Sequence, residues 1–325
     1  MHSLLASTLV ACLVAASSAT KQIVVLKSTT SSLQFTTHLA SLLGTGITPL
    51  DVFEIGSLKG YVVNSLAEVD YIDKDIVDYI EEDIPMHKKH TSNPRSNSLN
   101  LNSQSCQTQK NAPSWGLERT SSLKYPLTAY NYPTATPGET ADVYVLDTGI
   151  RTTHKEFQGR ASFAYNAAKG QINTDKDGHG TFVAGVLAAE HYGICKTCSV
   201  ISVKIFTDDG DCSASIIIAG LNFVMKQVQN RTKTSKKNIL INISVGGDPG
   251  QTSDAMDAAV NALVNAGVHV VTAAGNENVD ACTESPARAS KVIAVGSSMV
   301  LLGNEDYFLG GSNFGKCVKL FARKY

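Results

Sequence analysis

The stretch DKDGHGTFVAG, residues 175–185, places a histidine between two glycines at the start of a run of small and apolar residues. The run is typical of a helix, and glycine on both sides of His179 lets backbone and substrate come close to the ring. Histidine is the side chain best suited to transferring a proton near neutral pH. Taken alone, the stretch fits equally well a helix-capping loop with a structural histidine.

A second stretch, ADVYVLDTGI at residues 141–150, has the pattern of a buried strand that ends in a carboxylate and a glycine turn. Its Asp147 precedes His179 by 32 residues. This order and spacing match the aspartate and histidine of a subtilisin-type triad, in which the aspartate orients the imidazole that deprotonates a serine. The two stretches together favour catalysis over a structural histidine.

Composition and charge limit the classes of function. The chain has 325 residues, of which 43% are hydrophobic and 18% are charged, and 28 basic side chains stand against 29 acidic ones. This is ordinary for a soluble globular protein with room for one large and one small domain. The net charge of -1 gives no support for a nucleic acid or an anionic membrane as partner.

The amino-terminal residues 1–19 combine an apolar core, residues 4–16, with the small residues Ser17-Ser18-Ala19. This pattern predicts a secretory signal peptide, and the core is too short to span a bilayer. We therefore expect a soluble protein that is secreted to the extracellular space.

Six cysteines follow the predicted signal peptide, and an even number in an exported protein favours disulfides. They are Cys106, Cys195, Cys198, Cys212, Cys282 and Cys317. Cys195-Lys196-Thr197-Cys198 also fits half of a zinc site, but no matching half occurs elsewhere, so we predict no metal and no cofactor. The pairing of the first four stays open, and the first pair to examine joins Cys212 to Cys195 or Cys198.

Residues 20–90 show six alternating elements. Strands are predicted at 22–27, 50–56, 59–63 and 76–84, and helices at 31–43 and 66–71. The order is that of a ferredoxin-like split βαβ domain. The polar tract 87–105 has no apolar periodicity and indicates an exposed linker, which serves as a tether, as a processing site or as both.

From Asp142 onward, strands and helices alternate. Strands are predicted at 142–146, 200–205, 239–245, 269–273 and 292–296, and helices at 181–190, 213–229 and 253–266. Apolar strands joined by helices predict a mostly parallel sheet with helices on both faces. Asp147 and Asn276 follow strand ends, where such sheets gather their sites.

Three motifs resemble the signatures of the subtilase family: VLDTGI with Asp147, DGHGTFVAG with His179 and VTAAGNEN with Asn276. The segments NAPSWGLERTS, VKIFTDDG, INISVGG and NFGKCVKLFA are most similar to its proteinase K-like branch. The resemblance extends from about Val24 to the last residues. It implies a subtilisin-like fold, with 20–90 as a propeptide that inhibits its own enzyme, 91–112 as linker and mature amino terminus, and 113–325 as the catalytic domain.

The resemblance also implies a role for individual residues of a serine endopeptidase that acts on peptides or proteins. His179 would be the general base, Asp147 would orient it, and Asn276 would donate to the oxyanion. The substrate would pair with Ser244-Val245-Gly246 and, on the other side, with Gly210. Ala273-Ala274-Gly275 would form a wall of the specificity pocket.

Further expectations concern covalent features and assembly. Cysteines in the contexts of Cys282 and Cys317 pair in some relatives, which implies a disulfide here. Glycosylation is expected at Asn230, in Asn230-Arg231-Thr232, rather than at Asn242 inside a predicted strand. We expect a monomer whose mature chain starts between His90 and Cys106.

Departures from the family pattern leave two functions open. Lys319 stands where the family often has a calcium-binding aspartate, and Phe182 replaces a second histidine. Counting roughly 157 residues from His179 places the serine at about position 336, beyond Tyr325. The sequence thus predicts a serine endopeptidase zymogen truncated before its nucleophile and inactive as written. The alternative is a non-catalytic protein whose amino-terminal domain binds and inhibits a related protease.

Overall fold

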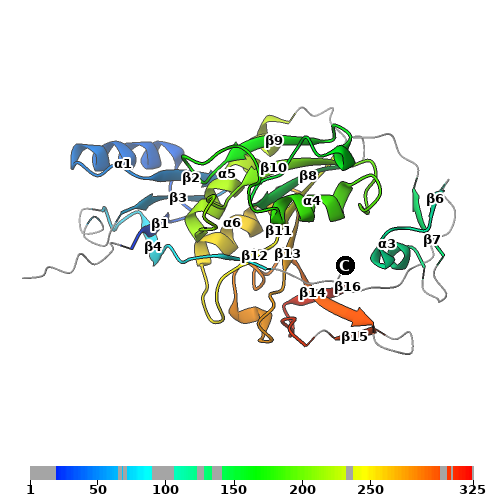
Figure 1. The fold of residues 1–325 in the computed structure, drawn as a ribbon. Helices are drawn as coiled ribbons and strands as arrows, with labels where there is room; N and C mark the ends of the chain where they lie inside the picture. Colours follow the sequence, from blue (N-terminus) through cyan, green and yellow to red (C-terminus); the bar gives the residue numbers. More distant parts are fainter. Residues whose placement is uncertain are drawn as a thin grey trace, which may run out of the picture.

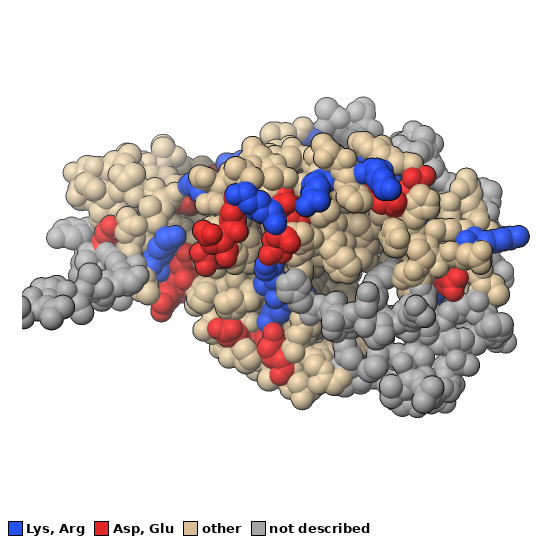
Figure 2. All heavy atoms as spheres, viewed as in Figure 1, with Lys and Arg blue, Asp and Glu red and all other residues tan. Residues whose placement is uncertain are grey.

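The computed structural model describes residues 20–64, 68, 72–89, 106–122, 128–133, 141–231, 237–300, 306–308 and 310–323. A small amino-terminal lobe, blue to cyan in Figure 1, packs against a larger α/β domain. The predicted signal peptide, residues 1–19, and most of the predicted linker lie outside the described residues. On the face drawn in Figure 2, basic and acidic side chains lie next to one another.

The amino-terminal lobe is a four-stranded antiparallel sheet in the order β2-β3-β1-β4, with the helix α1 against it. The elements are β1 (Gln22–Leu26), α1 (Ser32–Gly44), β2 (Asp51–Ile55), β3 (Leu58–Val63) and β4 (Val77–Glu82). A capping box at Ser31 and Gln34 begins α1. The predicted helix 66–71 lies outside the described residues except for residue 68, so the ferredoxin-like arrangement stays a prediction.

Alternate residues of β1 face two different hydrophobic cores. Val24 and Leu26 pack toward Phe35 of α1, whereas Ile23 and Val25 join the core of the α/β domain. Both faces of this sheet are therefore covered, which explains why β1 is buried over its whole length and is apolar from Ile23 to Leu26.

The α/β domain contains an eight-stranded sheet whose main path is β15-β14-β13-β11-β8-β10-β9, with β16 paired to β14. The strands are β8 (Ala141–Asp147), β9 (Ala161–Asn166), β10 (Ser199–Lys204), β11 (Asn238–Ile243), β13 (His269–Ala273), β14 (Ile293–Val300), β15 (Asp306–Phe308) and β16 (Val318–Arg323). Only the β14–β15 pair is antiparallel among the described pairs of this sheet.

Helices cover both faces of this sheet, as predicted (Figure 1). The helix α4 (His179–Ala188) packs on Val143 and Val145 of β8. The helices α5 (Ala214–Asn230) and α6 (Asp254–Asn265) pack on the opposite face, and the amino-terminal lobe lies against them.

Smaller elements complete the fold. β5 (His87–Lys88) pairs with β12 (Val245–Gly246), and β6 (Cys106–Lys110) pairs with β7 (Ala129–Pro133) near α3 (Trp115–Thr120). Two 3-10 turns, η1 (Lys155–Phe157) and η2 (Ala281–Thr283), lie between strands. The predicted strand 239–245 is divided at Ser244 into β11 and β12, which pair with different partners.

Candidate active site

His179 and Asp147 form a buried pair where β8 ends and α4 begins. Nδ1 of His179 lies 2.7 Å from Oδ1 of Asp147, and the two residues are 6% and 0% exposed. The close approach depends on Gly180, because a Cβ there would lie 2.1 Å from the carbonyl oxygen of Gly149. The two residues that the sequence places 32 positions apart are thus in direct contact.

The environment of His179 suits a base. A carboxylate can only accept, so Nδ1 carries the proton and Nε2 of the neutral ring is the atom that takes another. Burial lowers the pKa of His179, but the hydrogen bond and charge of Asp147 raise it by more, so that the pKa lies above its ordinary value of 6.5. The ring therefore holds a proton readily and is stabilised when charged.

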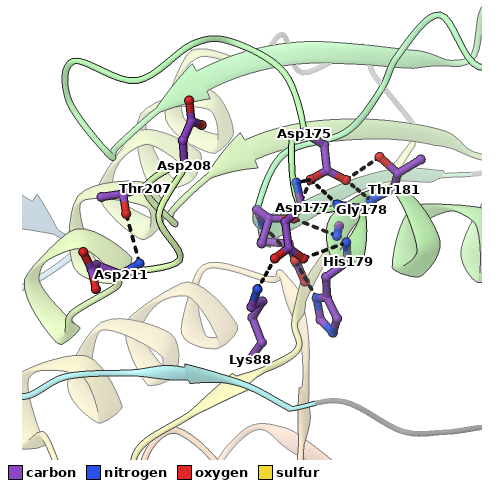
Figure 3. A network of polar contacts seen from close by, with 12 residues as sticks. Lys88, Asp175, Asp177, Gly178, His179, Thr181, Thr207, Asp208 and Asp211 are labelled. Carbon is purple, nitrogen blue, oxygen red and sulfur yellow. Dashed lines mark hydrogen bonds and ion pairs between the residues drawn. The ribbon is translucent and has the colours of Figure 1, made fainter.

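Asp175 fixes the loop that leads into His179 (Figure 3). Its Oδ1 accepts from Thr148 Oγ1 at 2.8 Å and from the backbone N–H groups of Asp177 and Gly178 at 3.1 and 2.8 Å. Its Oδ2 accepts from Thr181 N at 2.9 Å and Oγ1 at 2.5 Å. Burial raises the pKa of Asp175, but these hydrogen bonds lower it by more. Sequence reasoning assigned no role to Asp175, although an aspartate just before Gly178 and a helix start is typical of a capping loop.

A cavity of about 400 Å³ lies beside His179. Its lining includes Ser244, Ala273, Gly275 and Asn276, all predicted site residues. Ala274 is outside this lining, but its carbonyl oxygen accepts from Asn313 Nδ2 at 3.0 Å. The cavity thus brings His179 and Asn276 to one space, where an imidazole and a side-chain amide are the groups that acyl transfer can use.

The chain's own residues 84–89 run as an extended segment between residues 244–246 and residues 212–214, and we call the space between these two flanking segments the cleft. On one side β5 pairs with Val245 and Gly246, and Lys89 N donates to Ser244 O at 3.0 Å. On the other side Met86 N donates to Cys212 O at 3.0 Å, and Ala214 N donates to Ile84 O at 3.0 Å. Gly210 lies just before this second pairing, in a turn where Gly210 N donates to Thr207 O at 3.1 Å.

The family follows from sequence comparison. The model of the subtilase family matches residues 138–320, the region that holds the His179–Asp147 pair, β12 and Asn276. The chain belongs to the subtilase family. Its proteinase K-like placement rests on the segments named above.

Known subtilases resemble this one over about two thirds of the chain or more. The subtilisin-like serine protease Pen c 2 of Penicillium citrinum is 38% identical over 76% of this chain and 51% of its own length. Cerevisin of Saccharomyces cerevisiae is 39% identical over 66% of this chain and 34% of its own. The chain spans about half the length of the first curated relatives it matches.

A solved structure confirms the fold. The crystal structure of a cold-adapted subtilisin-like serine proteinase matches with a TM-score of 0.55 and 36% identity, covering 64% of this chain and 71% of that one. The mostly parallel sheet with helices on both faces is therefore the subtilisin-like fold.

The described cysteines form two disulfides. Cys282 is bonded to Cys317, and Cys195 is bonded to Cys198. The pair to examine first, Cys212 with Cys195 or Cys198, does not form, because Cys195 and Cys198 are bonded to each other with Cα atoms 5.5 Å apart. Cys212 is a buried free thiol whose carbonyl oxygen accepts from Met86 N. The bond between Cys195 and Cys198 removes the half zinc site from consideration. Burial raises the pKa of the Cys212 thiol well above its usual range.

The structure also describes the two candidate glycosylation residues, Asn230 and Asn242. Asn230 is the exposed last residue of α5, whereas Asn242 lies inside the central strand β11, where its Nδ2 donates to Ser244 Oγ at 2.9 Å. Within the described part of the chain, no group of three His, Cys, Asp or Glu side chains is arranged to hold a metal ion. None of the described helices is long and apolar enough to cross a membrane.

Proposed function

We propose that this subtilase chain belongs to a secreted serine endopeptidase zymogen that hydrolyses peptide bonds with Asp147, His179 and a serine. The main support is the buried 2.7 Å contact between His179 and Asp147, beside a cavity that Asn276 also lines. In this proposal residues 1–19 are the signal peptide, and the mature protein is a monomer that takes peptide or protein substrates.

The chemistry follows from the positions of these groups. Nε2 of His179 would take the serine proton while the serine oxygen attacks the substrate carbonyl carbon. Nδ2 of Asn276 would donate to the oxyanion that forms, and Asp147 would stabilise the imidazolium. His179 would then return the proton to the leaving amine, and water would release the acyl group through the same steps.

Residues 20–90 act in this proposal as a propeptide that inhibits the enzyme. The support is their docking on the catalytic domain and the passage of residues 84–89 through the cleft. Asp83 accepts from Ser215 N and Oγ at 2.8 and 2.6 Å. Glu81 accepts from Ser253 Oγ at 2.5 Å and from Asp254 N at 2.9 Å, so its negative charge lies at the start of α6.

The test is a chimera in which residues 1–322 are followed by the carboxyl-terminal segment of Pen c 2 beyond its matched region. We expect secretion, release of the amino-terminal segment and casein hydrolysis that a serine-directed inhibitor blocks. The variant His179→Ala should lower kcat at least about 10⁴-fold and prevent release.

Two controls accompany the chimera. His269→Ala changes an exposed histidine where β13 begins and should leave both readouts unchanged. The 325-residue chain, which contains no Gly-Thr-Ser segment, should keep its amino-terminal segment. Casein hydrolysis that persists in His179→Ala would refute the proposed function.

A further inference from the structure

A buried lysine fills a pocket that opens beside His179. The Lys89 side chain is 4% exposed and lies next to the cavity that His179 and Asn276 line. Its Nζ donates to Glu277 Oε1 at 2.7 Å, to Gly247 O at 2.9 Å and to Glu284 Oε2 at 3.3 Å. One ammonium group is thus enclosed by two carboxylates and a carbonyl oxygen.

The pocket is fixed by residues other than Lys89. Asn313, which is fully buried, donates from Nδ2 to Glu284 Oε1 at 2.9 Å and to Glu277 Oε2 at 3.2 Å. Its Oδ1 accepts from Glu277 N at 2.9 Å. Gly246 leaves room for the lysine stem, because a Cβ there would lie 2.6 Å from Lys89 Cε. Asn313 therefore holds the two carboxylates in place, and the lack of a side chain at Gly246 leaves the space that the Lys89 stem occupies.

Such a pocket disfavours an uncharged occupant. Glu284 has a side chain only 1% exposed, and burial raises its pKa although the charge of Lys89 opposes the rise. A buried carboxylate without a cation is costly, since the desolvation of the charge is then not compensated. An apolar side chain in this pocket would leave Asn313 bonded to both glutamates but would remove the ammonium group that balances their charge.

The backbone of Lys89 lies where a substrate residue would lie. Its N–H donates to Ser244 O, which extends the antiparallel pairing of β5 with β12, and its side chain lines the cavity together with His179. An ion pair with a purely structural role would need only a lysine close to the two glutamates. It would not need that lysine to lie at the end of a strand in the cleft, next to the proposed base His179.

The preceding residue, Lys88, meets a second acidic group. Its Nζ contacts the Asp177 carboxylate, as Figure 3 shows, and lies 5.8 Å from the centroid of the Phe206 ring. His179 N donates to Asp177 Oδ1 at 3.1 Å, so this carboxylate is part of the catalytic loop. The Lys88 side chain is 18% exposed, and its contact should contribute less than that of Lys89.

We propose that the cleft selects two consecutive basic side chains, the second in the pocket of Glu277 and Glu284, and that the Lys89–His90 bond is the one cut in maturation. This rests on the proposed function. The serine oxygen would bond to the Lys89 carbonyl carbon, the bond to His90 N would break, and His179 would pass the serine proton to that nitrogen. Water then gives the Lys89 carboxylate and restores the serine.

The first experiment needs no catalysis and uses the 325-residue chain. Lysines are acetylated with limiting acetic anhydride, and each rate is measured by mass spectrometry. Lys89 should react at least about tenfold more slowly than Lys169, whose side chain is 66% exposed. The double variant Glu277→Gln/Glu284→Gln should remove most of this protection, while Glu190→Gln should not. Lys204, which is 1% exposed and far from both glutamates in sequence, must stay slow in each variant to show that the fold persists.

The second experiment uses the active chimera on peptides that differ only at the two residues before the scissile bond. The peptide with Lys next to that bond should have a kcat/KM at least about 30-fold higher than the peptide with Met there. The variant Glu277→Gln/Glu284→Gln should abolish this preference. Replacing Ala by Lys one position earlier in the peptide should raise kcat/KM about threefold. The mature chain that the chimera releases should begin at His90.

The outcomes separate the two proposals. Equal or better cleavage after Met, or acetylation of Lys89 as fast as that of Lys169, overturns the basic pocket while the protease function stands. A chimera that hydrolyses no peptide overturns the protease function, and the acetylation rates then decide the pocket alone.

Discussion

Two loops that contribute to the lining of the cavity beside His179 are held in place in different ways. In the loop 175–181, a single carboxylate, that of Asp175, accepts from residues 2, 3 and 6 positions ahead, and from Thr148. In the loop 275–284, Glu277 and Glu284 are held by Asn313, 36 and 29 positions away, and by Lys89, 188 and 195 positions away.

This difference bears on two properties of the proposed enzyme, the geometry around His179 and the selection of a substrate side chain by Glu277 and Glu284. The loop 175–181 is organised mostly by its own residues, so that one short motif sets the position of His179. The loop 275–284 forms a pocket only when it contacts two segments that are distant in sequence, those of Lys89 and Asn313. We therefore expect substitutions at Glu284 to change which side chain the proposed pocket accepts and to leave the contact between His179 and Asp147 unchanged.

The largest effect is expected from loosening the pocket wall. Cys282 closes a disulfide with Cys317 across 35 residues, whereas Cys195 and Cys198 are 3 residues apart. By the loop-entropy model, Cys282→Ser/Cys317→Ser should lower the free energy of unfolding by about 3–4 kcal/mol and Cys195→Ser/Cys198→Ser by about 2 kcal/mol. Urea unfolding of both double variants without reductant measures this, and equal losses would contradict it.

Most of the fold was predictable where the signal is local. The apolar run before Asp147 predicts a buried strand, and β8 is buried along nearly its whole length. Helices α4, α5 and α6 begin and end close to their predicted bounds. The strands β9 and β16 were missed because their exposure pattern is that of partly open strands, with no continuous apolar run. Sequence alone locates the polar residues after β13 but not the pocket of Glu277 and Glu284, since Lys89 and Asn313 complete it through tertiary contacts.

A smaller loss of stability is expected when Asp175, in the loop that leads into His179, is replaced. Asp175→Ala removes a charged acceptor from five hydrogen bonds and leaves backbone N–H groups of the loop without their partner. We expect a loss of about 2–3 kcal/mol in the free energy of unfolding. Asp209→Ala, at an exposed position, is the matched control and should change it by less than about 0.5 kcal/mol. Equal unfolding midpoints for the two variants would mean that the loop does not depend on Asp175.

The smallest effect is expected from pH and tests whether Asp147 controls His179. The pKa of His179 is raised above 6.5 by Asp147 against the effect of burial, with Lys88 and Asp177 as the other charged groups that act on it. Its contribution to stability is therefore complete below pH 6.5 and is lost as the pH rises through the raised pKa. In Asp147→Asn the charge is gone and burial remains, so the pKa of His179 should fall below its ordinary value. The contribution of His179 should then increase with pH over the same window. The measurement is the free energy of unfolding from pH 5.5 to 8, with and without Asp147→Asn, each compared with the same chain carrying His179→Gln. The difference gives the contribution of His179 at each pH. If this contribution changes with pH in the same direction with and without Asp147→Asn, Asp147 does not hold the proton on the ring.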